Sequence, residues 1–385
     1  MGVGGDDARP LHSHRGQGRS VYPNATESTA GLPERTPEMR RLAPALALFF
    51  LAPLIAEFFL GDFPVTLLPL ILPLAPLYGG GALLIREITR RTGRGWPTIL
   101  VLALAFGVLE EALLTQSLFN PDYLGAHLLD IGFVPWLGIA IPWTIFVLTL
   151  HTVWSISTPV AIVEESTVGR RSRPWLGTLG LVVTIVLFVS GSVATFVSSY
   201  SQSNHFMASP AQLGISAAMV FVLVVIALRL PRMPAPIAQR DGWVPNPWLV
   251  LAVAMAAGAV FMESRLLPVW IGVAVALLAL AGMAALVSWW SARSSWGSWH
   301  RYALASGALL TYSWHAFTTT PVVGASATLN NLSHVIYAVG ALGILWLVAV
   351  LIRRQQSVAG PTDVSDAERM VPSTSAPGQP IQTSD

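Results

Sequence analysis

The sequence predicts an all-α, polytopic transmembrane helical bundle of about ten spans. Hydrophobic residues make up 53% of the chain and charged residues only 11%, whereas a soluble domain carries about 25% charge. The apolar residues occur in runs long enough to cross roughly 30 Å of hydrocarbon at about 1.5 Å per residue. We therefore expect a multi-pass protein of the cytoplasmic membrane, with the lipid bilayer as its first partner.

The predicted spans share an apolar composition and are separated by short polar loops. They cover residues 42–60, 64–85, 97–118, 135–163, 175–198, 211–229, 247–263, 267–290, 302–318 and 334–352. The short turn between the seventh and eighth spans leaves open whether these two form a re-entrant pair. The two ends of the chain are too poor in apolar residues to form a core. We expect a disordered cytosolic tail over residues 1–40, a transmembrane domain over 41–353, and a second disordered cytosolic tail over 354–385.

The distribution of arginine predicts that both termini lie inside. The loops that follow the even-numbered spans, counted together with the start of the C-terminal tail, carry fourteen arginines. The loops that follow the odd-numbered spans carry one, Arg265. Positive charge accumulates on the cytoplasmic side of membrane proteins. The basic pI of 9.2 thus reflects topology, and we expect no nucleic-acid partner.

The second span has an unusual composition for a membrane helix. Four prolines, at positions 64, 69, 73 and 76, precede Gly79-Gly80-Gly81. One interpretation is a kinked or broken helix, since irregular backbone at membrane depth survives when it is buried in protein or faces a cavity. The other is that the glycines allow close helix packing.

Five ionisable residues lie within the predicted spans, namely Glu57, Glu110, Glu111, His151 and, near an outer end, His315. Each charge at the bilayer centre costs about 2.5–3.5 kcal/mol, so each side chain must face the bundle interior or water. Counting from the nearest charged residue on the inner face places them all about 20–24 Å from the cytoplasmic boundary. Equal depth is what a shared site requires. Polar residues also share a helix face with each histidine, Thr144, Ser155 and Thr158 with the first and Thr311 and Thr318 with the second.

The candidate catalytic residues are therefore Glu110, Glu111, His151 and His315. Two adjacent carboxylates in a low-dielectric pocket do not both ionise cheaply. A carboxylate beside a histidine can take a proton from water and pass it to a leaving group. The absence of cysteine and of an H-E-x-x-H pattern means that no cofactor is predicted, although a metal bound by glutamate and histidine is permitted.

The stretch Leu109-Glu110-Glu111-Ala112-Leu113-Leu114-Thr115 resembles the first motif of the CAAX-protease and bacteriocin-processing family. Members of that family are multi-helix intramembrane proteases with an EExxxR motif, then FxxxH, then HxxxN or HxxxD. The resemblance implies that Glu110 and Glu111 activate water. It further implies that His151 corresponds to the second-motif histidine and His315 to the third.

The chain departs from the motifs of that family at three positions. Thr115 stands where the family has arginine, Val147 stands where it has phenylalanine, and Thr319 stands where it has Asn or Asp. The double glutamate on a helix is the direct match.

Three functions remain open from the sequence. The first is a glutamate-dependent intramembrane hydrolase with its site in the outer half of the membrane, acting on an unknown membrane-embedded or small-molecule substrate. The second is a proton- or cation-coupled transporter, in which the same residues bind the ion. The third is a non-catalytic membrane protein whose polar residues only order the helices.

The predicted orientation can be tested with reporter fusions. A reporter fused at Asn120 should be active outside the cytoplasm and one fused at Arg171 should be active inside, because these positions lie in loops of opposite charge. Reporters on the same side would contradict the topology and the depth estimate derived from it.

Overall fold

The computed structural model describes residues 37–232, 241–319, 321, 323 and 325–358, together with Met1. The predicted tails fall almost entirely outside these residues. Helices account for most of the described chain: α1 (Pro37–Pro53), α2 (Ile71–Arg91), α3 (Trp96–Val108), α4 (Ile141–Thr149), α5 (Thr158–Ser166), α6 (Thr178–Gln202), α7 (Pro210–Arg229), α8 (Pro247–Glu263), α9 (Val269–Ser291), α10 (Ser298–His315) and α11 (Ala327–Val358). A short antiparallel hairpin, β1 (Phe133–Val134) with β2 (Ile139–Ala140), precedes α4. This hairpin occupies the start of the predicted fourth span, whose helix begins only at Ile141.

Nine helical segments of the described chain are long and apolar enough to cross a membrane, which confirms the predicted class of fold. The predicted seventh and eighth spans are two separate full-length helices, α8 and α9. The ninth predicted span, α10, has 18 residues but is too polar to be counted with them. Because α10 packs against α5, α8 and α11, protein shields its polar residues from lipid.

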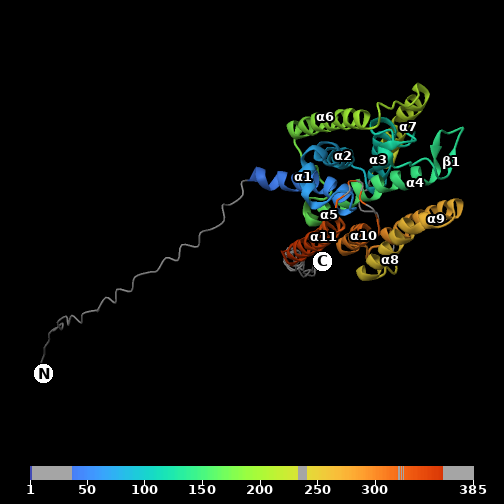
Figure 1. The fold of residues 1–385 in the computed structure, drawn as a ribbon. Coiled ribbons are helices and arrows are strands. Elements are labelled where there is room, and N and C mark those ends of the chain that lie inside the picture. The colour runs from blue at the N-terminus through green and yellow to red at the C-terminus, as the bar shows by residue number, and fades with distance from the viewer. Residues whose placement is uncertain (2–36, 233–240, 320, 322, 324, 359–385) are drawn as a thin grey trace, which may run out of the picture.

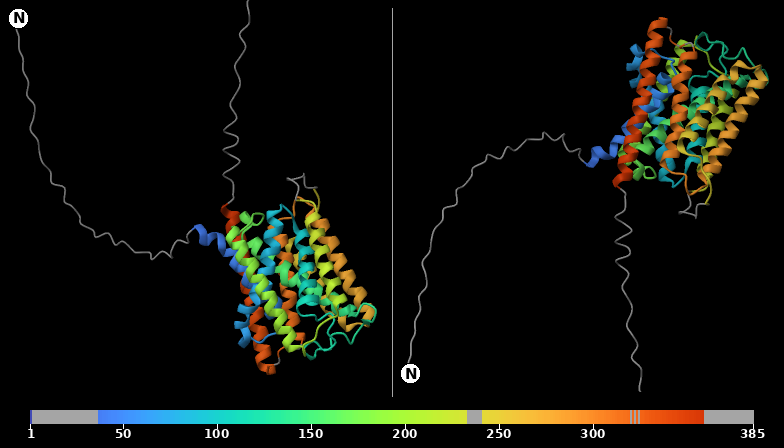
Figure 2. Two further views of the ribbon diagram at one scale, coloured as in Figure 1. Left: turned by 90° about the horizontal axis from the view of Figure 1, so that it is seen from above. Right: turned by 90° about the horizontal axis from the view of Figure 1, so that it is seen from below.

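The helices lie side by side in one bundle (Figure 1). Two further views show that the described ends of α1 and α11 lie at the same end of it (Figure 2), as an even number of crossings requires. Helices α6, α7 and α9 lie at the periphery, with only 11% of each apolar stretch buried. Their exposed valines, leucines and isoleucines are suited to contact lipid.

The second predicted span is continuous through its glycines. A 3₁₀ segment (Val65–Leu70) gives way to α2 at Ile71, and α2 then runs unbroken to Arg91. A Cβ atom built on Gly79 would overlap the backbone of Phe49 on α1, and one on Gly81 would meet the Phe106 ring on α3. The interpretation of these glycines as helix-packing positions is therefore correct. The helix is not broken at them, although the span changes from 3₁₀ to α geometry between Leu70 and Ile71.

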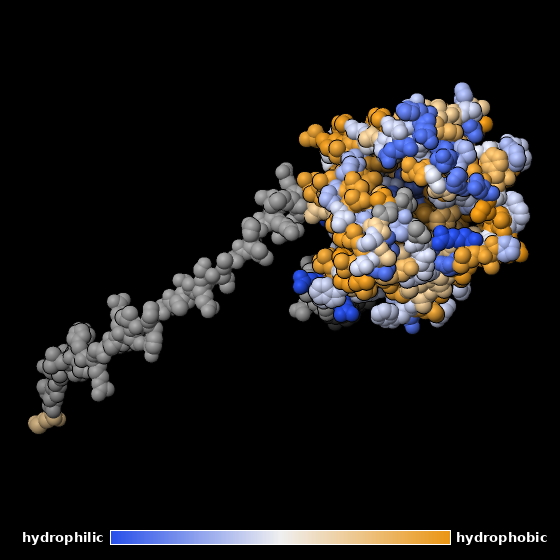
Figure 3. All heavy atoms as spheres, in the orientation of Figure 1, coloured by the Kyte–Doolittle hydropathy of each residue, from blue (hydrophilic) through white to orange (hydrophobic). Residues whose placement is uncertain are grey.

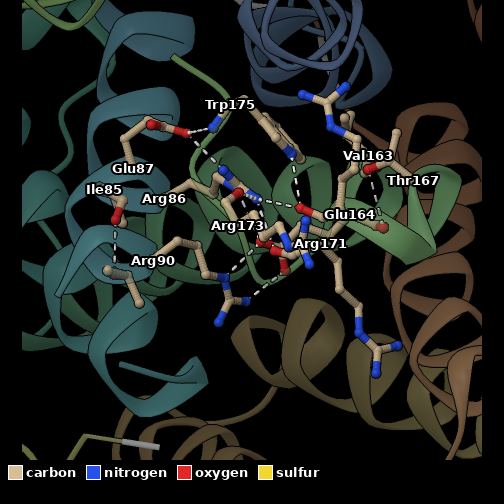
Figure 4. Close-up of polar contacts among 12 residues, drawn as sticks. Ile85, Arg86, Glu87, Arg90, Val163, Glu164, Thr167, Arg171, Arg173 and Trp175 are labelled. Atoms are coloured by element: carbon tan, nitrogen blue, oxygen red, sulfur yellow. Dashed lines mark hydrogen bonds and ion pairs between the residues drawn. The ribbon is translucent and has the colours of Figure 1, made fainter. Parts of the chain in front are cut away.

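A buried ionic network joins α2 to α5 at the end of the bundle that the arginines assign to the cytoplasm (Figure 4). Arg86 is fully buried and contacts Glu87 at 2.7 Å and Glu164 at 3.1 Å. Arg90 forms a second ion pair with Glu164 at 2.6 Å. The guanidinium carbon of Arg86 also lies 3.5 Å from the ring centroid of Trp175, so cation–π attraction adds to the ion pairs.

The same network fixes the loop between α5 and α6. Arg86 Nη2 donates to main-chain carbonyls of Arg171 and Arg173 at 2.8 and 2.7 Å, and Glu87 accepts the backbone N–H of Trp175 at 2.7 Å. The predicted second span ends at residue 85, directly before Arg86. In the structure the helix continues, because paired charges can be buried where isolated ones cannot.

Replacing Arg86 with alanine should strongly destabilise the bundle. The change leaves buried carboxylates without their cation, which costs about 3–5 kcal/mol. Thermal unfolding of the purified protein in detergent should show a clear fall in Tm. Lysine at this position should rescue little, because an ammonium group cannot reproduce the five-donor geometry. Exposed Arg354→Ala serves as the matched control; equal Tm values for the two alanine variants would contradict a stabilising network.

Candidate functional site

Three of the helical spans change from α to π geometry at the point where they carry an ionisable residue. Glu57 lies in the π turn Leu54–Phe59, the paired glutamates lie in Leu109–Leu114, and His151 lies in Leu150–Ser157. In the second of these, the Thr115 backbone N–H donates to the Glu110 carbonyl five residues earlier, at 2.8 Å. Such π turns are rare and occur frequently at functional sites.

His151 lies between the two predicted glutamates. Its Nε2 is 2.7 Å from Glu111 Oε1 and its Nδ1 is 3.2 Å from Glu110 Oε2. All three residues are buried, with exposed fractions of 3% for Glu110, 7% for Glu111 and 6% for His151. Gly107 permits this approach, since a Cβ atom there would stand 3.1 Å from His151 Cβ. The structure thus brings together the first three candidate residues.

Tyr78 joins Glu57 to this group. Its hydroxyl oxygen lies 2.5 Å from Glu110 Oε1 and is also hydrogen-bonded to Glu57 Oε1. A tyrosine hydroxyl has one proton to donate, so it cannot donate to both carboxylates at once. Tyr78 therefore bridges the two carboxyl groups and donates to one of them at a time.

Glu111 is held by hydroxyl groups that follow it in the chain. Its Oε2 accepts hydrogen bonds from Ser117 and, at 3.2 Å, from Thr115. Ser117 in turn accepts the indole N–H of Trp143 at 3.2 Å. With Oε1 on His151 and Oε2 on two hydroxyls, both oxygens of this carboxylate have partners.

Glu110 and His151, by contrast, each retain a free atom. Glu110 Oε2 and His151 Nδ1 face one another at 3.2 Å, yet neither has a partner with hydrogen-bond geometry among the described residues. Buried polar atoms without partners are uncommon and call for an explanation. Among the side-chain atoms of Glu110, Glu111 and His151, these two are the ones without a hydrogen-bond partner.

His315 lies in a different cluster. Its Nδ1 is 3.3 Å from Glu263 Oε1 at the end of α8, and its Nε2 accepts from Arg265 Nη2 at 3.4 Å. No contact joins it to the glutamates or to His151 within the described chain. The predicted depth was therefore an insufficient criterion for placing His315 in the shared site.

The polar faces beside the two histidines also have another role. Hydroxyls on these faces bond to carbonyls of their own helices, as Thr144 does with Ala140 and Thr311 with Gly307. Such bonds satisfy the hydroxyls locally, so these residues do not build the site.

Tyr78, Ser117 and Trp143 belong to the site but were not predicted. A neutral tyrosine in an apolar span looks like a packing residue, and Ser117 and Trp143, which lie within the predicted third and fourth spans, are neutral as well. The one signal for Tyr78 was its place directly before the glycines that bring α2 close to α3.

Two ionisable groups in loops border the site. Partial enclosure raises the pKa of the Asp62 carboxyl well above its ordinary value, and the charge of Glu57 raises it further. Burial also raises the pKa of the Tyr123 hydroxyl, with Glu111 adding to the shift. Both loops thus lie within electrostatic reach of the buried carboxylates.

The residues fit the requirements of a metal site in part. Ligand atoms of Glu110, Glu111 and His151 lie within 4.8 Å of one another, and carboxylate with imidazole suits zinc and related metals. The unpartnered Glu110 and His151 atoms would be the available ligands, with Glu111 holding the other imidazole nitrogen from behind.

Comparisons with known proteins agree with a membrane fold. No curated protein and no solved structure matches the chain. One family model matches residues 46–362, which include the ionic network, the buried glutamates and both histidines. On this match, the chain belongs to a family described as an uncharacterized membrane protein family.

Proposed function

We propose that this protein is a glutamate-dependent intramembrane hydrolase with Glu110, Glu111 and His151 at its centre. The observation that supports this proposal is the buried imidazole with one carboxylate on each ring nitrogen, at 2.7 and 3.2 Å. The order of the paired glutamates and the histidine along the chain also resembles that of the CAAX-protease and bacteriocin-processing family.

In this proposal a water molecule binds beside Glu110 Oε2 and His151 Nδ1, the two buried atoms that have no partner among the described residues. Glu110 accepts a proton from this water while the water oxygen attacks the substrate carbonyl. The proton then passes from Glu110 to the leaving group. Glu111 fixes the imidazole through Nε2 and stabilises its charged form. The Tyr78 hydroxyl, on the other Glu110 oxygen, orients the base. The net change is addition of one water across one acyl bond.

The transporter alternative needs a path to the opposite face of the membrane. In the described structure the cytoplasmic end of the bundle is occupied by the Arg86 network, whose side chains are paired and buried. A closed inner end, with the buried glutamates and His151 in the other half of the bundle, favours a hydrolase over a carrier.

Single replacement of Glu110 or Glu111 with glutamine should separate chemistry from packing. Each change keeps the volume of the side chain but removes a titrating oxygen. We expect the Tm in detergent to stay constant or rise, because a buried charge has been removed, while hydrolysis falls by at least about a hundredfold. A marked fall in Tm for both variants would instead support a purely structural role.

The reaction itself can be sought by isotope incorporation. Purified protein in ¹⁸O-labelled water would be incubated with a fluorogenic peptide library and with p-nitrophenyl acyl esters of graded chain length. A hydrolase should place ¹⁸O in the product carboxylate, and Glu110→Gln should abolish that signal. A second series after dialysis against a chelator would reveal whether a metal participates. Wild-type protein that matches Glu110→Gln on every substrate would refute the proposed function.

A further inference from the structure

Two cavities lie one after the other along α9, away from the buried glutamates. The loop-side cavity is lined by Ala126, His127, Leu128 and Ile131, by the start of α4 and by the turn between α8 and α9, and has a volume of about 320 Å³. The apolar cavity lies between α5, α8, α9 and α10 and has a volume of about 430 Å³. Phe261 lines both. The face over α4 and α9 is visibly hollowed, and apolar and hydrophilic residues meet at its rim (Figure 3).

The two cavities together extend along the membrane-crossing direction. Val269 at the start of α9 lines the loop-side cavity, and Ser291 at its end lines the apolar cavity. These residues bound a helix about 33 Å long. Each volume falls in the range of about 300–1,000 Å³ typical of small-molecule sites. The mostly apolar space along one helix suits an alkyl chain.

The charge on the walls is positive at the loop end. Arg265 lines the loop-side cavity with His127, and no acidic residue lines either cavity within the described chain. The Arg265 side chain is exposed and has no carboxylate within ion-pair distance among the described residues. Its guanidinium lies 5.8 Å from the Phe146 ring centroid and contacts His315 at 3.4 Å. An arginine in this setting is suited to bind a carboxylate or phosphate through its planar fork of donors.

We propose that these cavities bind a single-chain amphiphile, with its anionic headgroup on Arg265 and its acyl chain along α9. A wall of the loop-side cavity leads to the candidate site, because Trp143 lines that cavity and donates to Ser117, which in turn bonds to Glu111. The binding site stands on the cavities and their charge. Its assignment as the substrate site, and so of acyl amphiphiles as the substrate class, rests on the proposed function.

Tritiated palmitate is the probe that tests this inference, on full-length protein purified in dodecyl maltoside. Wild-type protein should bind it saturably, and unlabelled hexadecyltrimethylammonium, with the same chain length and the opposite charge, should not compete. Arg265→Gln should weaken binding by at least about tenfold, the loss expected on removing charge-assisted hydrogen bonds. Arg293→Gln, which changes an arginine outside both cavities, serves as the charge control.

The chain-binding half of the site has its own matched pair on α9. Ala279 lines the apolar cavity, whereas Ala274 lies on the exposed face of the same helix. Ala279→Trp should abolish palmitate binding and Ala274→Trp should leave it unchanged, with equal Tm values showing that both fold. Competition by the cationic amphiphile, or wild-type binding by Arg265→Gln or Ala279→Trp, would overturn the inference.

The same assay separates this inference from the proposed function. Glu111→Gln should bind palmitate as tightly as wild type. If wild-type protein binds palmitate selectively but hydrolyses no substrate, the amphiphile site is supported and the hydrolase proposal is refuted. If wild-type protein hydrolyses a substrate but binds palmitate without selectivity, the hydrolase proposal is supported and the amphiphile site is refuted.

Discussion

The burial of charge in hydrocarbon is the constraint on which this architecture depends. Each ionised side chain near the bilayer centre costs about 2.5–3.5 kcal/mol, so every such group must find a partner inside the protein. Among the clusters that meet this requirement in the described chain, one surrounds Arg86 and Glu164 and another surrounds His151 and the paired glutamates. The two clusters meet it differently. In the first, Arg86 donates hydrogen bonds to the carboxylates of Glu87 and Glu164 and to two main-chain carbonyls. In the second, Glu110 Oε2 and His151 Nδ1 remain without partners. A network whose polar atoms are all paired holds helices together, whereas the second cluster keeps two polar atoms without a partner.

The sequence was sufficient to predict the class of fold and part of the site, because both follow from the depth of each residue in the membrane. Hydropathy and charge locate residues along the membrane normal, and this placed Glu57, Glu110, Glu111 and His151 at one depth. Depth says nothing about position around the bundle. His315 has the required depth but lies on α10, where it contacts Glu263 and Arg265. Neutral residues escape this reasoning altogether, which is why Tyr78 was missed. The extent of α2 was underestimated for a related reason, since a charged residue ends a span only when it has no partner.

The π turns had no signal in the sequence, yet they shape the site. Adjacent residues on an α-helix point about 100° apart, so two neighbouring glutamates would ordinarily face different surroundings. At Leu109–Leu114 the helix widens, and both carboxylates reach the same imidazole. His151 lies in a π turn of its own. Contacts with neighbouring helices fix this arrangement, and Gly107 supplies one of them by allowing His151 to approach closely.

The two adjacent glutamates cannot be told apart from the sequence, but their contacts in the structure differ. Glu111 has a partner on each oxygen, with His151 on one side and the hydroxyls of Ser117 and Thr115 on the other. A carboxylate with both oxygens engaged is suited to position and charge its neighbour. Glu110 has one oxygen on Tyr78 and one without a partner, and a base requires such a free oxygen to take a proton. If the site is hydrolytic, Glu110 is therefore the base and Glu111 the residue that orients His151.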